Sequence, residues 1–249
     1  MKKVLIEVCC GSFEDCLIAE SAGADRIELN TAVFLGGLTP SLGCLVKVKE
    51  NVKIPVIPMI RPREAGFYYS DYEYAVMKHD AEVFIKHGAD GLVFGFLNAN
   101  GSFNRDRMYE FTRICLDAGK DAVCHRSFDV TPDPYAALDL LIELGVTRVL
   151  TSGQQPTAIK GVDLITDLIK YANERIEILP GAGLNHTNLV DFIKKTGADQ
   201  VHFSANVFKP DPSTSGKPNI HFGSLSPPRD DGISVTDENK LQKNISVLS

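Results

Sequence analysis

The segment "KHGADGLVF" (residues 86–94) completes a predicted helix, stops it at a glycine and begins a predicted strand. Closely similar segments stand at "SAGADRIEL" (21–29) and "KTGADQVHF" (195–203). Glycine can adopt the left-handed conformation that ends a helix, and the apolar run after the aspartate has the character of a strand. The repeated Gly-Ala-Asp therefore indicates a recurring unit of helix and strand, which bears on the fold and not on the function.

Short apolar runs alternate with longer helical patterns up to about residue 204. Segments such as "DRMYEFTRICLDAG" (106–119) and "PYAALDLLIELG" (134–145) carry apolar residues at three- and four-residue spacing and end at glycine. Such a helical stretch follows each of the first seven strands. The eight predicted strands are 4–9, 25–29, 55–60, 91–95, 122–126, 148–152, 177–181 and 200–204.

Eight βα units predict a (β/α)8 TIM barrel, because right-handed crossovers between parallel strands can close on themselves at that number. An open doubly wound sheet is the alternative. It is disfavoured because the turn after the first strand, "CCGSFED" (9–15), lacks G-x-G-x-x-G and offers only one glycine and Ser12 as an N-cap. No nucleotide cofactor is therefore expected.

The alternating pattern stops after Ser204, and we expect the barrel to span residues 1–206. Residues 207–249 include "KPDPSTSGKP" (209–218) and "SPPRDDG" (226–232), which are typical of irregular structure. This C-terminal extension is expected to pack on the barrel or on a partner subunit. A short helix is predicted near "DENKLQKNI" (237–245), with Thr236 as its N-cap.

The composition describes an ordinary globular protein of 249 residues, with 44% hydrophobic and 23% charged residues. The net charge of -6 argues against a nucleic-acid partner, which would require a basic excess. No apolar run approaches the roughly 20 residues that cross a bilayer, so no membrane association is expected and the predicted location is cytoplasmic. Six cysteines are too few for a disulfide scaffold in a chain of this length and should stay reduced.

Functional residues of a barrel lie at the carboxyl ends of its strands, where the βα loops converge. Glu7 and Glu28 stand on the first two strands, and His125 and His202 on the fifth and eighth. These four are the predicted acid–base residues, and they could alternatively bind a divalent ion such as Mn²⁺ or Zn²⁺. For each histidine, a hydrogen-bonded place in the core is the competing interpretation. Four further histidines, on predicted helices or loops, are assigned no role: His79, His87, His186 and His221.

The segment "MIRPR" (59–63) places two arginines where the third strand ends. Arg61 could neutralise a buried carboxylate, but four arginines near one mouth exceed the two strand carboxylates and leave charge for an anion. Glycines and serines after the last strands occupy the place where many barrels bind phosphate, although they could equally be turn residues. The predicted anion site consists of Arg26, Arg61, Arg63, Arg126, Ser152, Gly181, Gly183 and Ser204.

The segment "EVCCG" (7–11) carries two adjacent cysteines that face opposite ways on a strand. Cys9 could reach the barrel mouth and offer a soft thiolate suited to Cu(I). Spacing alone favours a buried cysteine followed by a turn cysteine, since metal loops use C-x-x-C.

Several motifs, from about residue 4 to 206, stand in the order and spacing of the CutC copper homeostasis proteins, which the chain resembles: "IEVC" (6–9), "GADRIEL" (23–29), "GGLTPSLG" (36–43), "PVIPMIRPR" (55–63), "GADGLVFG" (88–95), "HRSFD" (125–129), "RVLTSG" (148–153), "PGAG" (180–183) and "HFSA" (202–205). The resemblance implies a cytoplasmic TIM barrel that forms a homo-oligomer, acts in copper homeostasis and binds Cu(I). The implied copper ligands are cysteines after the first two strands. Cys9 matches the first of them, and Asn30 stands where many relatives have the second.

Two hypotheses follow for the function. In the first, the protein handles copper and binds Cu(I) through Cys9, with Cys10, Cys44 or a second subunit supplying another ligand. In the second, it is an enzyme, an isomerase or lyase, acting on a small phosphorylated or carboxylated metabolite. The absence of a lysine from the predicted strand ends disfavours Schiff-base chemistry.

Overall fold

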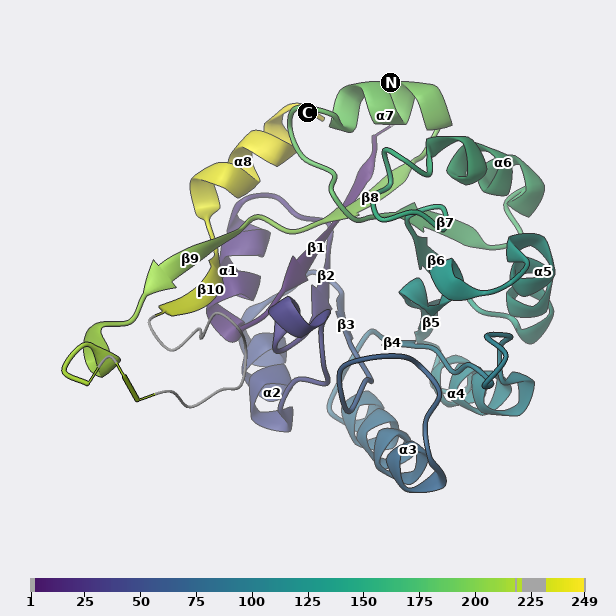
Figure 1. The fold of residues 1–249 in the computed structure, drawn as a ribbon, viewed down its shortest axis with the longest axis horizontal. Coiled ribbons are helices and arrows are strands. Elements are labelled where there is room, and N and C mark those ends of the chain that lie inside the picture. The colour runs from purple at the N-terminus through teal and green to yellow at the C-terminus, as the bar shows by residue number, and fades with distance from the viewer. Residues whose placement is uncertain (1–2, 218, 221–231, 249) are drawn as a thin grey trace.

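The predicted alternation of parallel strands and helices is confirmed by a computed structural model, which describes residues 3–217, 219–220 and 232–248 (Figure 1). The barrel strands are β1 (Leu5–Cys10), β2 (Arg26–Leu29), β3 (Val56–Pro58), β4 (Gly91–Phe94), β5 (Asp121–Cys124), β6 (Arg148–Thr151), β7 (Glu177–Pro180) and β8 (Gln200–Phe203). The helices around them are α1 (Phe13–Ser21), α2 (Leu42–Asn51), α3 (Asp71–Lys86), α4 (Arg105–Asp117), α5 (Pro134–Leu144), α6 (Val162–Ala172) and α7 (Leu189–Thr196). Short 3-10 helices are η1 (Val33–Leu35), η2 (Arg126–Val130) and η3 (Pro212–Thr214).

The strands form two parallel ladders in the orders β3-β2-β1-β8 and β4-β5-β6-β7. A bridge between Met59 and Val93 joins β3 to β4, and β7 lies beside β8. Because all eight strands run the same way around the ring, their carboxyl ends meet at one mouth. The closure makes β8 a neighbour of β1, so that Glu7 is paired in register with both Arg26 and His202.

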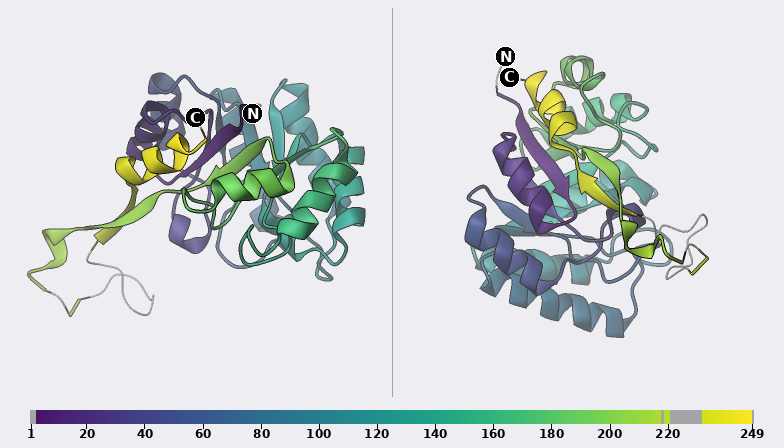
Figure 2. Two further views of the ribbon diagram at one scale, coloured as in Figure 1. Left: turned by 90° about the horizontal axis from the view of Figure 1, so that it is seen from above. Right: turned by 90° about the vertical axis from the view of Figure 1, so that its left-hand side faces the viewer.

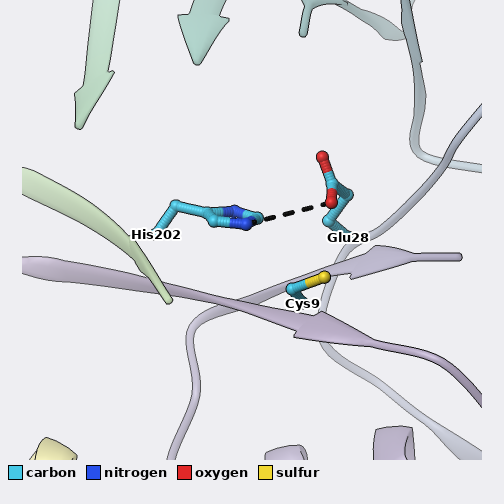
Figure 3. Close-up of side chains that lie close together, drawn as sticks. All are labelled: Cys9, Glu28 and His202. Carbon is cyan, nitrogen blue, oxygen red and sulfur yellow. Dashed lines mark ion pairs between the residues drawn. The ribbon is translucent and has the colours of Figure 1, made fainter. Parts of the chain in front are cut away.

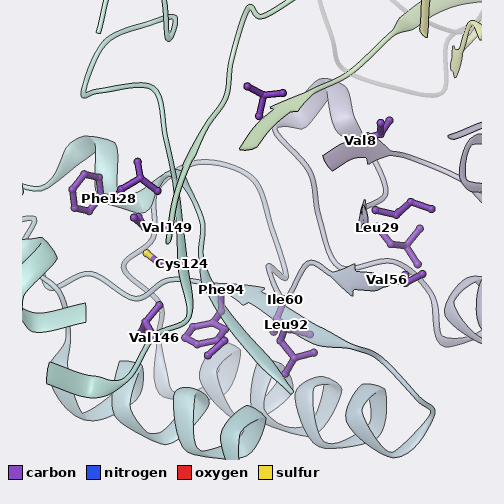
Figure 4. Packing of buried hydrophobic residues seen from close by; sticks show 14 of the residues in the cluster. Val8, Leu29, Val56, Ile60, Leu92, Phe94, Cys124, Phe128, Val146 and Val149 are labelled. Carbon is purple, nitrogen blue, oxygen red and sulfur yellow. The ribbon is translucent and has the colours of Figure 1, made fainter. Parts of the chain in front are cut away.

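Alternate residues of each strand face the helices or the barrel interior. The outward residues pack with the helices in the main core, which Figure 4 shows around Val8, Leu29 and Phe94. Inside the barrel, one side is apolar and consists of Ile57, Met59, Val93 and Val123. The other side is buried and polar, and consists of Glu7, Arg26, Glu28, Arg148, Gln200 and His202. The candidate site includes residues of this polar side.

The C-terminal extension begins with an antiparallel ribbon of β9 (Asn206–Pro210) and β10 (Gly232–Thr236), which projects from the barrel (Figures 1 and 2). The sequence pattern did not predict this ribbon, because its partners lie far apart in a segment rich in proline and serine. The segment "SPPRDDG" lies outside the described residues apart from its final glycine. Within the described residues, no helix combines the length and the apolar character that a bilayer span requires.

The chain then returns to the barrel as helix α8 (Glu238–Ser246), which buries Leu241 and Ile245. The predicted N-cap, Thr236, was wrong. Asp237 caps the helix by accepting a hydrogen bond from the Lys240 N–H (2.7 Å). Thr236 ends β10 instead, and its N–H donates to Asp15 of α1 (2.7 Å). The prediction placed the cap one residue early because Thr236 pairs with Asn206 in the ribbon, and the sequence around Thr236 does not show this pairing.

Candidate metal and ligand site at the barrel mouth

Cys9, Glu28 and His202 converge at the carboxyl ends of β1, β2 and β8 (Figure 3). Their potential ligand atoms, one from each side chain, all lie within 4.8 Å of one another, and all three residues are buried. The convergence follows from the register, since Cys9 stands opposite Glu28 in the ladder and β8 flanks β1 on its other side. A thiol, a carboxyl group and an imidazole so placed form a potential three-ligand metal site.

Glu7 fixes the orientation of the His202 ring. His202 Nδ1 lies 2.8 Å from Glu7 Oε1, while Nε2 lies 3.9 Å from Glu28 Oε2, as the dashed line in Figure 3 marks. A carboxylate bonded to one ring nitrogen of a histidine, with the other nitrogen turned to a metal, is a recurrent arrangement in metal sites. Glu7 therefore orients the imidazole ring of His202 without belonging to the three ligand residues. The Nε2 atom of His202 is the one available to a ligand.

Glu7 is itself held by an ion pair with Arg26, whose Nη2 donates to Gln200 Oε1 (2.9 Å). Burial opposes the ionisation of Glu7, but the guanidinium of Arg26 and the contact with His202 hold its pKa well below the ordinary value. Glu7 is thus an anion at neutral pH. Arg26, which the sequence suggested for anion binding, is occupied by this buried carboxylate.

The three residues of the candidate site are electrostatically coupled. Burial raises the pKa of the Cys9 thiol, and the carboxylates of Glu28 and Glu7 raise it further. Burial also raises the pKa of Glu28. For His202, burial alone would lower the pKa, but Glu28 and Glu7 reverse this and raise it above the ordinary value. The raised pKa values favour the protonated forms of all three groups, and a metal ion bound there would compete with these protons.

Asn30 contacts two members of the cluster. Its Nδ2 group donates to Glu28 Oε2 (2.8 Å) and to Cys9 Sγ (3.5 Å), while its Oδ1 atom is buried without a partner among the described residues. Gly37, at φ 82°, passes so close that a Cβ there would overlap Asn30 Oδ1. Asn30 thus orients the Glu28 carboxylate and offers the Cys9 sulfur a hydrogen bond.

The structure does not bring His125 into this cluster. His125 directly follows β5, packs against Phe67 at 4.6 Å between ring centroids, and accepts a hydrogen bond from the Ser127 N–H at Nδ1 (3.1 Å). Burial and the neighbouring Arg61 lower its pKa to about 3. His125 is therefore neutral, and its environment is that of a core histidine.

Arg61 and Arg63 are engaged away from the cluster. Buried Arg61 donates to the carbonyl groups of Leu35, Gly37 and Ala65 at 2.8 to 3.1 Å, which ties together the two loops after β2 and β3. Arg63 pairs with Glu73, the N-terminal capping-box residue of α3. Each contact replaces water around a guanidinium with fixed oxygens. The two arginines that drew attention in the sequence therefore organise loops.

A pocket of about 400 Å³ opens beside the cluster. Its lining includes Cys9 and His202 on the inner wall and three residues of the predicted anion site, namely Arg126, Gly183 and Ser204. Two more predicted members lie just behind it: Ser152 accepts a hydrogen bond from Arg126 Nη2 (2.6 Å), and Gly181 packs against His202. The structure thus groups five of the eight residues predicted to bind an anion around one cavity.

Sequence reasoning missed some of the residues that shape this region. In the sequence Asn30 stands out only as the replacement for a cysteine, although its place directly after β2, two residues from Glu28 and on the same side of the strand, is a usable signal. His186 was assigned no role, yet it lines the pocket together with Asn185 and Lys240. Lys240 lies on α8, beyond the barrel pattern, and only the return of the chain onto the barrel brings it there.

Comparisons with known proteins agree with this architecture. A sequence model described as the CutC family matches residues 4–207. The family protein CutC of Treponema denticola is 52% identical over the full length of both chains, and the human copper homeostasis protein cutC homolog is 40% identical over 96% of this chain and 86% of its own. The solved structure of CutC from Streptococcus agalactiae superposes with a TM-score of 0.75 at 32% identity, covering 80% of this chain and 98% of that one.

Proposed function

This chain belongs to the CutC family as a homologue of copper homeostasis proteins, and from that premise we propose that it binds one Cu(I) ion through Cys9, His202 and Glu28. The observation that supports the proposal is the convergence of these three ligand atoms within 4.8 Å at the barrel mouth. Neither Cys10 nor Cys44 belongs to this group, so the second ligand is a histidine and not the further cysteine that the sequence suggested.

The donor set suits a soft metal ion. Thiolate ligands favour Cu(I), and imidazole binds copper as well as zinc. Glu7 keeps the His202 ring turned with Nε2 toward the site, and Asn30 supports both the carboxylate and the sulfur. The carboxylate of Glu28 supplies negative charge that would offset the charge of the ion. Because Zn²⁺ accepts the same three donors, the experiment must compare the two metals.

An anaerobic titration of the reduced protein against a Cu(I)-specific chelator tests the proposal. We expect one Cu(I) per chain, and a metal concentration 100 times the dissociation constant should stabilise the fold by about 2.7 kcal/mol. Zn²⁺ serves as the comparison. Absence of stoichiometric Cu(I) binding, or tighter binding of Zn²⁺, would contradict the assignment of the site to copper.

Replacing Asn30 with cysteine should tighten Cu(I) binding by about tenfold or more, because a second thiolate would stand beside Cys9. The present amide lies 3.5 Å from the Cys9 sulfur, so the position is within reach of a shared ion. The same chelator competition measures the gain, and Asn30→Ser, which lacks a soft donor, is the control. Equal affinities for the cysteine and serine variants would show that position 30 cannot reach the metal.

The six described cysteines are all free, which supports a reducing compartment such as the cytoplasm. The predicted homo-oligomer and the predicted isomerase or lyase activity stay predictions. Three of the four acid–base residues predicted for that enzyme, Glu7, Glu28 and His202, also surround the candidate metal site, whereas the fourth, His125, lies apart from it.

A further inference from the structure

The ionisable side chains that line the mouth pocket, other than the Cys9 thiol, are all basic. They are Arg126, His186, His202 and Lys240, and no aspartate or glutamate belongs to the described lining. The formal net charge of the whole chain, by contrast, is -6. A pocket lined by two side chains that carry a positive charge, Arg126 and Lys240, has a local positive potential, and such a potential favours a negatively charged ligand.

Arg126 has donor capacity to spare. Its Nε group donates to Asp129 (2.7 Å) and its Nη2 group to Ser152 (2.6 Å), while Nη1 makes no hydrogen bond to any described residue. Asp129 is in turn saturated, because it accepts hydrogen bonds from the Thr151 hydroxyl and from the backbone N–H groups of Ser152 and Gln154. The guanidinium of Arg126 is therefore held in place by Asp129 and Ser152, and its Nη1 group can still donate hydrogen bonds to a ligand.

Lys240 comes from the C-terminal extension. Its Nζ group donates to the carbonyl oxygen of Asn206 (2.9 Å), which uses one of its three donors. The helix that carries it is anchored to the barrel by Asn244, whose Oδ1 accepts a hydrogen bond from the His186 N–H (2.8 Å). The extension thus holds a second cation at the mouth, opposite the loops of the barrel itself.

We propose that the mouth pocket binds a small anion, a phosphate or a carboxylate, between Arg126 and Lys240. A volume of about 400 Å³ is that of a small-molecule site. Gly183 and Ser204 also line the pocket. Gly183 has no side chain to occupy the space, and the Ser204 hydroxyl can donate a hydrogen bond to the anion. This site goes beyond the proposed copper function, because neither cation is a candidate metal ligand. A ligand held there would touch the inner wall formed by Cys9 and His202.

Calorimetric titration of the metal-free protein with inorganic phosphate and with succinate, at constant ionic strength, tests the proposal. We expect saturable binding of at least one of the two, and the preferred probe distinguishes a phosphate from a carboxylate ligand. Lys240→Gln should weaken it about tenfold, since one charged contact is lost. Lys240 is exposed, so the variant should fold normally. Arg126→Gln should have an effect of similar size.

Lys243→Gln is the matched control, because Lys243 is also exposed on α8 but does not line the pocket. It should leave anion binding unchanged, because its charge is not presented to the pocket. If neither probe binds saturably, or if Lys243→Gln weakens binding as much as Lys240→Gln does, the anion site is refuted. Either result would leave the Cu(I) proposal intact.

Discussion

Cys9→Ser is expected to weaken Cu(I) binding by at least about 100-fold, since it removes the soft donor of the site. A serine hydroxyl at this place would stay protonated and is a poor ligand for a soft ion. His202 and Glu28 alone form a harder donor pair, and the remaining affinity should shift from copper toward zinc. Chelator competition under anaerobic conditions measures the change.

Cys44→Ser provides the control. Cys44 is also a free cysteine, but it lies half-buried on α2 and outside the cluster. It should keep the full affinity for Cu(I). If both variants lose binding to the same extent, the ion is not held at the mouth. If Cys9→Ser binds as tightly as the original protein, the thiol is not a ligand.

Arg26→Met should destabilise the fold by about 3–5 kcal/mol, because it leaves the Glu7 carboxylate buried without its guanidinium partner. The Arg26 side chain is 5% exposed and that of Glu7 is 2% exposed, so water cannot replace the lost contact. His202 remains as a hydrogen-bond partner and limits the loss. Urea unfolding, followed by circular dichroism, gives the free energy of unfolding.

The double variant Glu7→Gln/Arg26→Met removes both charges and should recover part of the lost stability. Arg105→Met is the comparison for a pair at the surface: Arg105 and Glu143 also form an ion pair, but both side chains are more than half exposed. This change should have little effect on the free energy of unfolding, since water solvates the remaining carboxylate. A loss at Arg26 no larger than at Arg105 would mean that the interior pair does not stabilise the barrel.

The barrel itself could be read from the sequence because its signals are local. The Gly-Ala-Asp segments mark helix ends at Gly23, Gly88 and Gly197, and all three glycines adopt positive φ in the structure. The two-residue period of a strand likewise puts Glu7 and Cys9 on the same side of the first strand. Both expectations require only neighbours along the chain, and both describe the structure correctly.

The partners of charged groups could not be read in this way. Four arginines looked equivalent at predicted strand ends and in the loop that follows the third strand. In the structure one neutralises Glu7, one ties loops together and one forms an ion pair with Glu73, while Arg126 alone of the four lines the pocket. A guanidinium reaches several residues away from its backbone, so its partner depends on which loops fold across it. The local sequence pattern therefore does not predict which group each arginine contacts.

The sequence by itself determined the eight βα units, the inward faces of the strands and the presence of a thiol, two carboxylates and a histidine among them. Only the tertiary structure decided that Cys9, Glu28 and His202 meet while His125 stands apart, because closure of the ring makes β8 the neighbour of β1. It alone also placed Asn30 against the thiol and Lys240 beside the pocket. Periodicity acts between residues close in the chain, whereas a binding site is assembled by contacts between residues nearly 200 positions apart, such as Glu7 and His202.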